Sequence, residues 1–264
     1  AHVSGECYCV NDNGEMCKGF QEVEGETRFF DEESGRMLKN WQNIDEKRYY
    51  FGDDGVMRKG VADVNGEKMR FDENGVYQPV KICLDAGHYS KYNNSPVNPD
   101  YWESDFNWDF HLMLKEELEK RGMVVITTRE DKDVDLDVEE RGRKSAGCDL
   151  FLSIHSNACD NSETDSPEAF CTINGKSDDI GLILAKTVAE TMRTYQSGTI
   201  IHRDCELGDF YGMLRGAAEV GTPGIMMEHS FHTNLNAVNW LLDKNNLRKL
   251  AEAEAEAIYK FYIL

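Results

Sequence analysis

The sequence predicts two folded parts: an all-β module of stacked hairpins over residues 1–78 and an α/β domain over residues 79–264. A repeat of about twenty residues fills the first third of the chain and stops at Gln78-Pro79. Beyond that point, short apolar runs alternate with segments of helical periodicity, which is typical of a mostly parallel or mixed sheet flanked by helices.

The repeat is marked by glycines at spacings of 20 or 21 residues, with a methionine two residues after each of the first three. These positions are Gly14, Gly35, Gly55 and Gly75, and Met16, Met37 and Met57. In each block an aromatic strand precedes an Asn/Asp-Gly or similar turn and a short strand, which predicts a β-hairpin. One hairpin cannot bury its apolar face alone, so successive hairpins should stack. The aromatic residues expected between them are Phe29, Phe30, Trp41, Tyr49 and Tyr50.

The second part is predicted element by element from its periodicity. Apolar runs of strand length predict strands, and apolar residues at helical spacing predict helices, the first of which ends at Gly122. The last helix carries the stretch AEAEAEA, and we expect a strongly acidic face there. In chain order, the predicted elements are strand 80–85, helix 103–121, strand 123–129, helix 136–146, strand 149–156, helix 177–195, strand 224–228 and helix 247–262.

Composition excludes several classes of protein. With 40% hydrophobic and 10% aromatic residues the chain can bury a core, so it is not a disordered protein. A net charge of −20 would repel nucleic acid, and no apolar run approaches the ~20 residues that span a membrane. The eight cysteines are scattered, and we expect most to be buried as small apolar residues. For Cys7, Cys9 and Cys17, a disulfide, free thiols and a metal site all remain open.

Four residues lie where an open α/β sheet places its chemistry. His88, His155 and Glu228 follow or end predicted strands, and Glu103 opens the first predicted helix. Two imidazoles and a carboxylate are a normal catalytic zinc set, and a second carboxylate could then transfer the proton of the attacking water. Asp85 either orients His88 or satisfies backbone amides in its own turn.

The motifs of this part resemble the zinc-dependent N-acetylmuramoyl-L-alanine amidases of the type 3 family. The resemblance implies His88, Glu103 and His155 as zinc ligands and Glu228 as the catalytic acid/base. It implies hydrolysis of the amide between N-acetylmuramic acid and the L-alanine of the stem peptide in peptidoglycan. The matching stretches are DAGH (85–88), Glu103 with Asn107, TTRED (127–131), Leu136 with Arg141, CDLFLSIHSNA (148–158), Leu214-Arg215 and TPGIMMEHSFHTN (222–234).

Residues 5–78 resemble the cell-wall-binding repeats of the choline-binding type, in which aromatics of neighbouring repeats cage a cation. The Gly-Trp step of that family varies here: it is Gly19-Phe20, Asn40-Trp41 and Gly60-Val61. A core of stacked aromatics and a working ligand cage, for choline or another wall polymer, are the two interpretations. The combination implies a secreted, wall-associated enzyme, either an autolysin or a phage endolysin.

Further residues near the predicted site have two interpretations each. His229 and His232 would cap turns or add surface polarity, or else hold substrate or the oxyanion; His202 is a third extra histidine. Arg141 and Arg215 are expected in structural ion pairs, and the polar segment 159–167 is expected to shape the substrate groove. The alternative functions are a non-catalytic wall-binding protein and a zinc peptidase or deacetylase acting on another amide.

Overall fold

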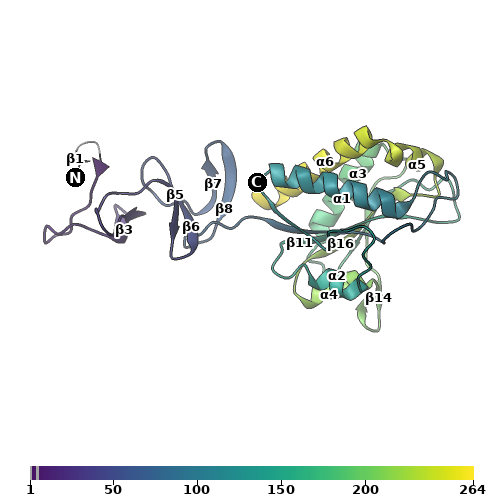
Figure 1. Cartoon of the computed structure of the whole chain (residues 1–264), viewed down its shortest axis with the longest axis horizontal. Helices are drawn as coiled ribbons and strands as arrows, with labels where there is room; N and C mark the ends of the chain where they lie inside the picture. Colours follow the sequence, from purple (N-terminus) through teal and green to yellow (C-terminus); the bar gives the residue numbers. More distant parts are fainter. Residues whose placement is uncertain (1, 4–5) are drawn as a thin grey trace. The chain divides into compact units, whose positions relative to one another are not determined.

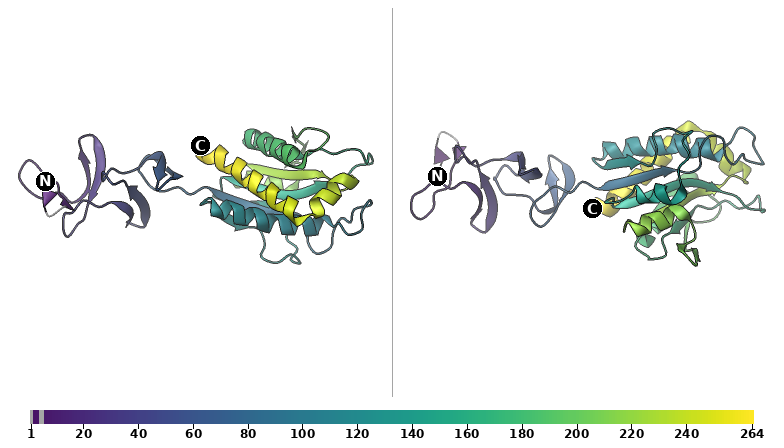
Figure 2. Two further views of the ribbon diagram at one scale, coloured as in Figure 1. Left: turned by 90° about the horizontal axis from the view of Figure 1, so that it is seen from above. Right: turned by 60° about the horizontal axis from the view of Figure 1, so that its bottom comes forward.

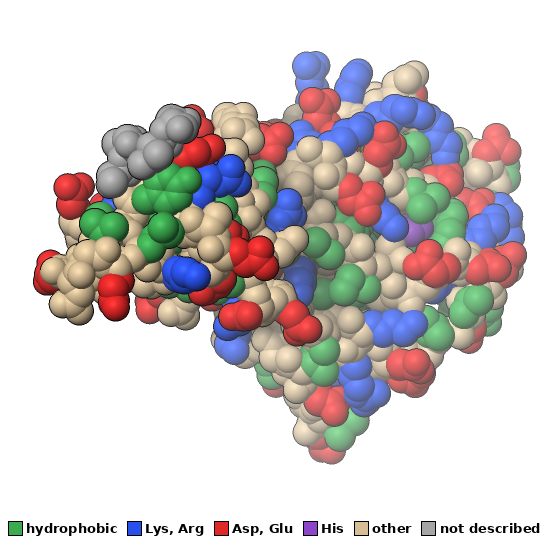
Figure 3. All heavy atoms as spheres, turned by 60° about the vertical axis from the view of Figure 1, so that its left-hand side comes forward, with side chains coloured by type: hydrophobic (Ala, Val, Ile, Leu, Met, Phe, Trp, Pro, Cys, Tyr) green, Lys and Arg blue, Asp and Glu red, His purple; other side chains and the backbone are tan. Residues whose placement is uncertain are grey.

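The computed structural model describes residues 2–3 and 6–264. The chain forms two compact units, Ala1–Pro79 with Ile263–Leu264, and Val80–Tyr262. The first consists of short antiparallel hairpins, and the second of a sheet covered by helices (Figure 1). This is the predicted fold class. Asp and Glu side chains are spread among Lys and Arg on the surface shown in Figure 3, in keeping with the net charge of −20.

Within the described residues, the first unit contains four antiparallel strand pairs, which confirms the predicted hairpins. Three of the pairs have five-residue strands with matching registers, so they are structural repeats of one another. The pairs are β1 (His2–Val3) with β2 (Glu6–Cys7), β3 (Gly19–Val23) with β4 (Glu26–Phe30), β5 (Asn40–Ile44) with β6 (Lys47–Phe51), and β7 (Gly60–Val64) with β8 (Glu67–Phe71).

The hairpin turns lie elsewhere than the sequence predicted. The three long hairpins turn through Glu24-Gly25, Asp45-Glu46 and Asn65-Gly66, and all six residues have positive φ, as a two-residue type I′ turn requires. The recurring glycines instead lie in a second turn after each aromatic strand, closed by an isolated bridge such as that of Phe51 with Met57. Spacing alone did not distinguish these two turns, because both contain Gly, Asn and Asp.

The common period of glycine and methionine has a packing explanation. Each methionine sulfur lies against the glycine of the following block, where a Cβ atom would approach it to 1.9, 2.4 and 2.5 Å. The three pairs are Met16 with Gly35, Met37 with Gly55 and Met57 with Gly75. The repeats therefore stack by placing a flexible side chain over a residue that has none.

The aromatic residues form the core of this unit. Phe29, Phe30, Tyr49 and Tyr50 are buried, as predicted, whereas Trp41 is only partly buried. The Arg48 guanidinium carbon lies 4.0 Å from the centroid of the Trp41 ring. One face of Trp41 is therefore already covered by a cation of the chain itself.

The second unit is built on a six-stranded mixed sheet of order β10-β9-β11-β16-β12-β13. Only the pairing of β12 with β16 is antiparallel among these neighbours. The strands are β9 (Lys81–Ala86), β10 (Val124–Thr127), β11 (Leu150–Asn157), β12 (Glu168–Cys171), β13 (Thr199–Ile201) and β16 (Gly224–Phe231).

Helices cover both faces of this sheet, with α1, α3, α5 and α6 on one face and α2 and α4 on the other (Figures 1 and 2). Their bounds are α1 (Glu103–Lys120), α2 (Val138–Arg143), α3 (Asp178–Met192), α4 (Gly212–Glu219), α5 (Leu235–Leu242) and α6 (Lys244–Ile263). None of the helices within residues 6–264 has the length and hydropathy of a membrane span.

Several elements escaped the sequence prediction: β12, β13, α4, α5, and the small hairpin of β14 (Asp204–Cys205) and β15 (Gly208–Asp209). They are short and lack a long apolar period, so only their tertiary contacts reveal them. In α4, the glycines that weaken helix propensity permit close packing on α2. A Cβ at Gly216 would lie 2.0 Å from the Glu139 carbonyl oxygen, and one at Gly142 would lie 2.0 Å from that of Met213.

Two further sequence predictions were wrong. The glutamates of AEAEAEA do not form one acidic face: Glu252 and Glu256 are about one turn apart on the same side of the helix, but Glu254 lies nearly opposite and is fully buried. Most cysteines are not buried: Cys83, Cys148 and Cys171 are, while the other five are half-buried or exposed. In the first unit, the Cys9 and Cys17 sulfurs lie 2.7 Å apart.

Candidate active site

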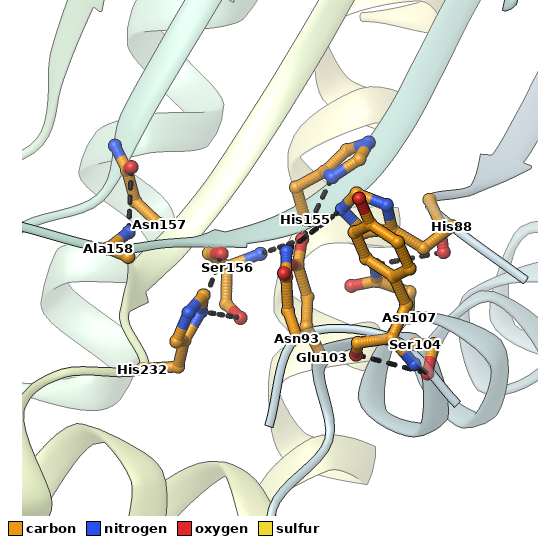
Figure 4. Close-up of polar contacts among 12 residues, drawn as sticks. His88, Asn93, Glu103, Ser104, Asn107, His155, Ser156, Asn157, Ala158 and His232 are labelled. Atoms are coloured by element: carbon orange, nitrogen blue, oxygen red, sulfur yellow. Dashed lines mark hydrogen bonds and ion pairs between the residues drawn. The ribbon is translucent and has the colours of Figure 1, made fainter. Parts of the chain in front are cut away.

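Three neighbouring strands bring the predicted residues to one edge of the sheet. His155 on β11 is the register partner of Glu228 on β16, and Ile154 on β11 pairs with Ala86 at the end of β9. His88 follows β9 by two residues, so it reaches the same edge. Glu103 is the first residue of α1 and faces both histidines (Figure 4).

The side chains of His88, Glu103 and His155 converge on one point. Glu103 Oε1 lies 2.9 Å from His155 Nδ1 and 3.2 Å from His88 Nε2. The possible ligand atoms of the three residues all lie within 4.8 Å of one another, which makes the group a candidate metal site. Asn93 Nδ2 donates to Glu103 Oε2 at 2.6 Å and so orients the carboxylate.

The charges of this cluster suit metal binding. Burial opposes ionisation of Glu103, but hydrogen bonds and positive charge from His155 and His88 hold the pKa of this carboxyl well below its usual range. Burial lowers the pKa of His155 although Glu103 favours the charged ring. A carboxylate at Glu103 beside a readily neutral imidazole at His155 is the protonation state that a cation requires of these two ligands.

Asp85 supports His155, and its contacts match neither predicted role. It accepts hydrogen bonds from Thr128 Oγ1 at 2.7 Å, Ser153 Oγ at 2.6 Å and Arg141, whose Nε lies 2.8 Å away. Ser153 Oγ in turn lies 3.1 Å from His155 Nε2. Asp85 therefore acts on His155 through Ser153, and not on His88 or on its own turn. Arg141 forms the structural ion pair that was expected.

Gly87 of the DAGH motif is required by the close approach of His155. A Cβ on Gly87 would lie 2.3 Å from Cε1 and 2.5 Å from Nε2 of the His155 ring, and 2.6 Å from the Ile154 carbonyl oxygen. These atoms belong to a buried ring and to backbone, so they cannot move aside cheaply. The glycine thus allows His155 to lie over the end of β9.

We predict that Gly87→Ala displaces the His155 ring and weakens the binding of a divalent metal ion at the candidate site by about 10–100-fold, the usual cost of disturbing the support of a metal ligand. Competition with a chromophoric chelator measures this affinity. Thermal unfolding of the metal-free protein serves as the control, since it separates a displaced ligand from a misfolded domain. An unchanged metal affinity in a folded variant would show that the His155 ring tolerates the added methyl group.

Glu228 lies beside the cluster and is not a member of it. Its side chain is buried, and within the described residues its Oε2 has no hydrogen-bond partner. Burial and the negative charges of Glu103 and Glu168 raise the pKa of Glu228 well above its usual value, while Arg203 opposes the rise. A carboxyl group with a raised pKa and a free oxygen is suited to accepting and returning a proton.

All four predicted residues line one pocket of ≈ 290 Å³. His232 lines it too; it is buried, with Nδ1 3.0 Å from Ser156 Oγ, so it is not a surface residue. The group of possible metal ligands does not include it. His229 is fully buried, with Nε2 2.9 Å from Glu254 Oε1, and ties β16 to α6. His202 is exposed and paired with Asp178, outside the residues that line this pocket.

Some contacts of the site were not predicted. Asn93 and Tyr92, whose ring stacks on His88 at 4.4 Å, belong to a loop without periodicity. Ser153 could have been predicted, because residues two apart on a strand share a face and Ser153 lies two residues before His155.

Two other predictions concern residues outside the cluster. Arg215 forms its expected ion pair, with Glu139 at 3.0 Å. Within residues 6–264, Cys7, Cys9 and Cys17 do not come together as a group of metal ligands.

Comparison with known proteins identifies the family. A sequence profile described as N-acetylmuramoyl-L-alanine amidase matches residues 82–260. The chain belongs to the N-acetylmuramoyl-L-alanine amidase family. A profile of the choline-binding repeat matches residues 38–76 of this amidase, within its hairpin repeats. A search of curated proteins found no match.

Solved structures share the amidase fold. Cwp6 from Clostridium difficile is 22% identical with a TM-score of 0.63; the match covers 72% of this chain and 30% of the Cwp6 chain. The CwlV catalytic domain from Bacillus (Paenibacillus) polymyxa is 20% identical with a TM-score of 0.58, covering 69% and 97%. AmiC2 of Nostoc punctiforme is 22% identical with a TM-score of 0.58, covering 69% and 96%.

The family membership confirms the predicted enzyme class. The chain is a hydrolase of the amidase type that acts on peptidoglycan, and the non-catalytic alternative is not favoured. The repeat match supports binding to a cell-wall polymer and a location outside the cell or in its wall.

Proposed function

We propose that this amidase is zinc-dependent, with His88, Glu103 and His155 as the metal ligands and Glu228 as the general acid/base. The observation that carries the proposal is the convergence of the three ligand atoms within 4.8 Å, beside a buried carboxylate with a free oxygen. Two imidazoles and a carboxylate fit zinc in particular, which in catalytic sites takes three such ligands and keeps a position open. The bond cleaved is the amide between the lactyl group of N-acetylmuramic acid and L-alanine.

Zinc bound there would polarise the scissile carbonyl and favour deprotonation of water near neutral pH. The chain itself provides the proton transfer. The water oxygen bonds to the carbonyl carbon while Glu228 Oε2 accepts a proton from the water. Glu228 then returns this proton to the amide nitrogen as the carbon–nitrogen bond breaks. The raised pKa of Glu228 makes it both a competent base and a competent acid.

The repeats of residues 1–78 serve, in this proposal, to hold the catalytic domain of residues 79–264 at the bacterial envelope. The stacked hairpins and the match to choline-binding repeats support this division. The enzyme would then be secreted, whether as an autolysin of the cell or as a phage endolysin. A wall polymer is the ligand class that suits such repeats.

Digestion of purified peptidoglycan tests the proposal, with released fragments identified by mass spectrometry. We expect free stem peptides that begin with L-alanine beside intact glycan, lost when a chelator is added and restored by Zn²⁺. Cleavage within the stem or loss of acetyl groups would instead favour a zinc peptidase or deacetylase. Intact wall that retains the protein would favour a binding protein.

A further inference from the structure

A second pocket of ≈ 490 Å³ adjoins the catalytic pocket. The two share the lining residues Asn157, Ala158 and Tyr211, so they form neighbouring parts of one surface depression. Figure 4 shows Asn157 and Ala158 on the side of the site away from His88. A substrate that occupies the catalytic pocket can therefore extend into the second pocket without leaving the protein surface.

Arg203 lines the second pocket and is held in place by aromatic rings. Its guanidinium carbon lies 5.1 Å from the ring centroid of Phe170, 5.6 Å from that of Phe210 and 5.7 Å from that of Tyr211. Nη1 donates to the Tyr211 hydroxyl at 2.9 Å. Stacking on several rings immobilises a side chain that would otherwise lose much rotamer freedom on binding a ligand.

Arg203 forms no ion pair within the described part of the chain, although its charge favours the ionised forms of Glu168 and Glu228 nearby. Among residues 6–264, no Asp or Glu lies within ion-pair distance of Arg203, whereas half of the arginines of the second unit form an ion pair: Arg121, Arg141, Arg143 and Arg215. Only one of its five N–H groups is used by a side-chain contact, so an edge of the guanidinium is available for a planar, two-point contact with a carboxylate.

The surrounding charge makes this cation important. Glu168 lines the same pocket, Glu103 and Glu228 line the adjoining one, and the chain carries a net charge of −20. An anionic substrate group would be repelled there without a compensating cation. Arg203 is the one Lys or Arg among the described residues that line the second pocket.

The substrate has an anionic group at a suitable place. The cleaved amide precedes L-alanine, so in the bound substrate the stem peptide extends from the catalytic pocket on one side and the glycan extends on the other. The residue after L-alanine in peptidoglycan is a glutamate linked through its γ-carboxyl group. Its α-carboxyl group is therefore a free carboxylate, or an amide where the wall is amidated.

We infer that the second pocket is the stem-peptide subsite, and that Arg203 binds the α-carboxylate of the residue that follows L-alanine. This inference rests on the proposed amidase reaction and adds its substrate preference. The contact acts on binding and specificity, because the carboxylate lies outside the bond that is broken. It predicts that the enzyme discriminates between stems with a carboxylate and stems with an amide at this position.

The test compares N-acetylmuramoyl-L-alanyl-D-isoglutamate with its D-isoglutamine counterpart, with release of the peptide measured at several substrate concentrations. We expect the wild-type kcat/KM to be about 10–100-fold higher for the carboxylate, the usual effect of a hydrogen bond to a charged group. In Arg203→Gln this preference should fall to less than about threefold, through a higher KM for the carboxylate with kcat little changed. Arg203→Lys, which keeps the charge but loses the planar fork, should lie between the two.

Arg248→Gln is the matched control, because it removes the same charge from an exposed position on α6 that lines neither pocket. It should leave the preference intact, and thermal unfolding of all variants checks folding. Equal kcat/KM values of the wild type for both substrates would contradict the assignment of Arg203 to the carboxylate. An equal fall in kcat/KM for both substrates in a folded Arg203→Gln variant would contradict it too. Failure of the wild type to release peptide from either substrate would instead contradict the amidase reaction itself.

Discussion

Glu228→Gln is expected to lower kcat for stem-peptide release by about 10²–10⁴-fold, the range usual for loss of a general acid/base. The amide keeps the shape of the buried side chain but cannot accept the proton of the attacking water. Zinc affinity should remain within a few-fold, because Glu228 is not a member of the ligand cluster. Steady-state kinetics on purified peptidoglycan and metal analysis of the same preparation measure both quantities.

Glu228→Asp is the control variant, since it keeps the carboxylate on a side chain that is one methylene group shorter. Partial activity is expected there, above that of the glutamine variant. A glutamine variant that turns over at the wild-type rate would remove Glu228 from the mechanism. Loss of zinc together with activity would show instead that it holds the metal site together.

Asp85→Asn is expected to destabilise the catalytic domain by about 3–5 kcal/mol, as breaking a buried ion pair does. The change leaves the Arg141 guanidinium buried without its negative partner. It also exchanges a carboxylate that accepts from Thr128 and Ser153 for an amide that accepts through one oxygen only. Chemical denaturation of the metal-free protein measures the free energy of unfolding.

The same carboxylate predicts a pH dependence. Burial opposes ionisation of Asp85, but Arg141 and the hydrogen bonds of Ser153 and Thr128 lower its pKa from 3.8 to about 2. The folded state thus binds this proton less readily than the unfolded state, so Asp85 stabilises the fold fully above about pH 4 and loses that contribution as the pH falls toward 2. The asparagine variant should lack this part of the acid transition.

Asp133→Asn is the matched control, because Asp133 is exposed on the loop before α2. Its effect on the free energy of unfolding should stay within about 0.5 kcal/mol, as for other surface positions. Wild-type stability and an unchanged acid transition in Asp85→Asn would show that the ion pair contributes nothing to the fold.

Much of the fold was predictable because its signals are local. β9, β11 and β16 each contain a short apolar run, and the hairpin repeats show a period of 20 or 21 residues. The elements that escaped prediction have no such signal. β12 is four residues long, and Gly216 of α4 is explained only by the backbone of α2 lying against it.

The candidate site divides in the same way. His88, Glu103, His155 and Glu228 were selected by residue type, motif and place at the ends of strands, and the structure gathers them in one pocket. The pairing of Asp85 with Arg141 was not predictable, because the two residues are 56 positions apart in the chain. Likewise, the burial of Glu254 depends on His229 of β16 facing α6.

The sequence by itself determined which residues carry chemistry and which segments repeat or alternate, since these properties follow from residue type and local period. The tertiary structure alone decided which of them meet. In the repeats, it shows that the recurring glycines lie in a second turn after each aromatic strand. It places Ser153 between Asp85 and His155. It also packs Arg203 against three aromatic rings beside the catalytic pocket. The physical reason is that contacts between distant segments depend on packing in three dimensions, which leaves no period in the chain to read.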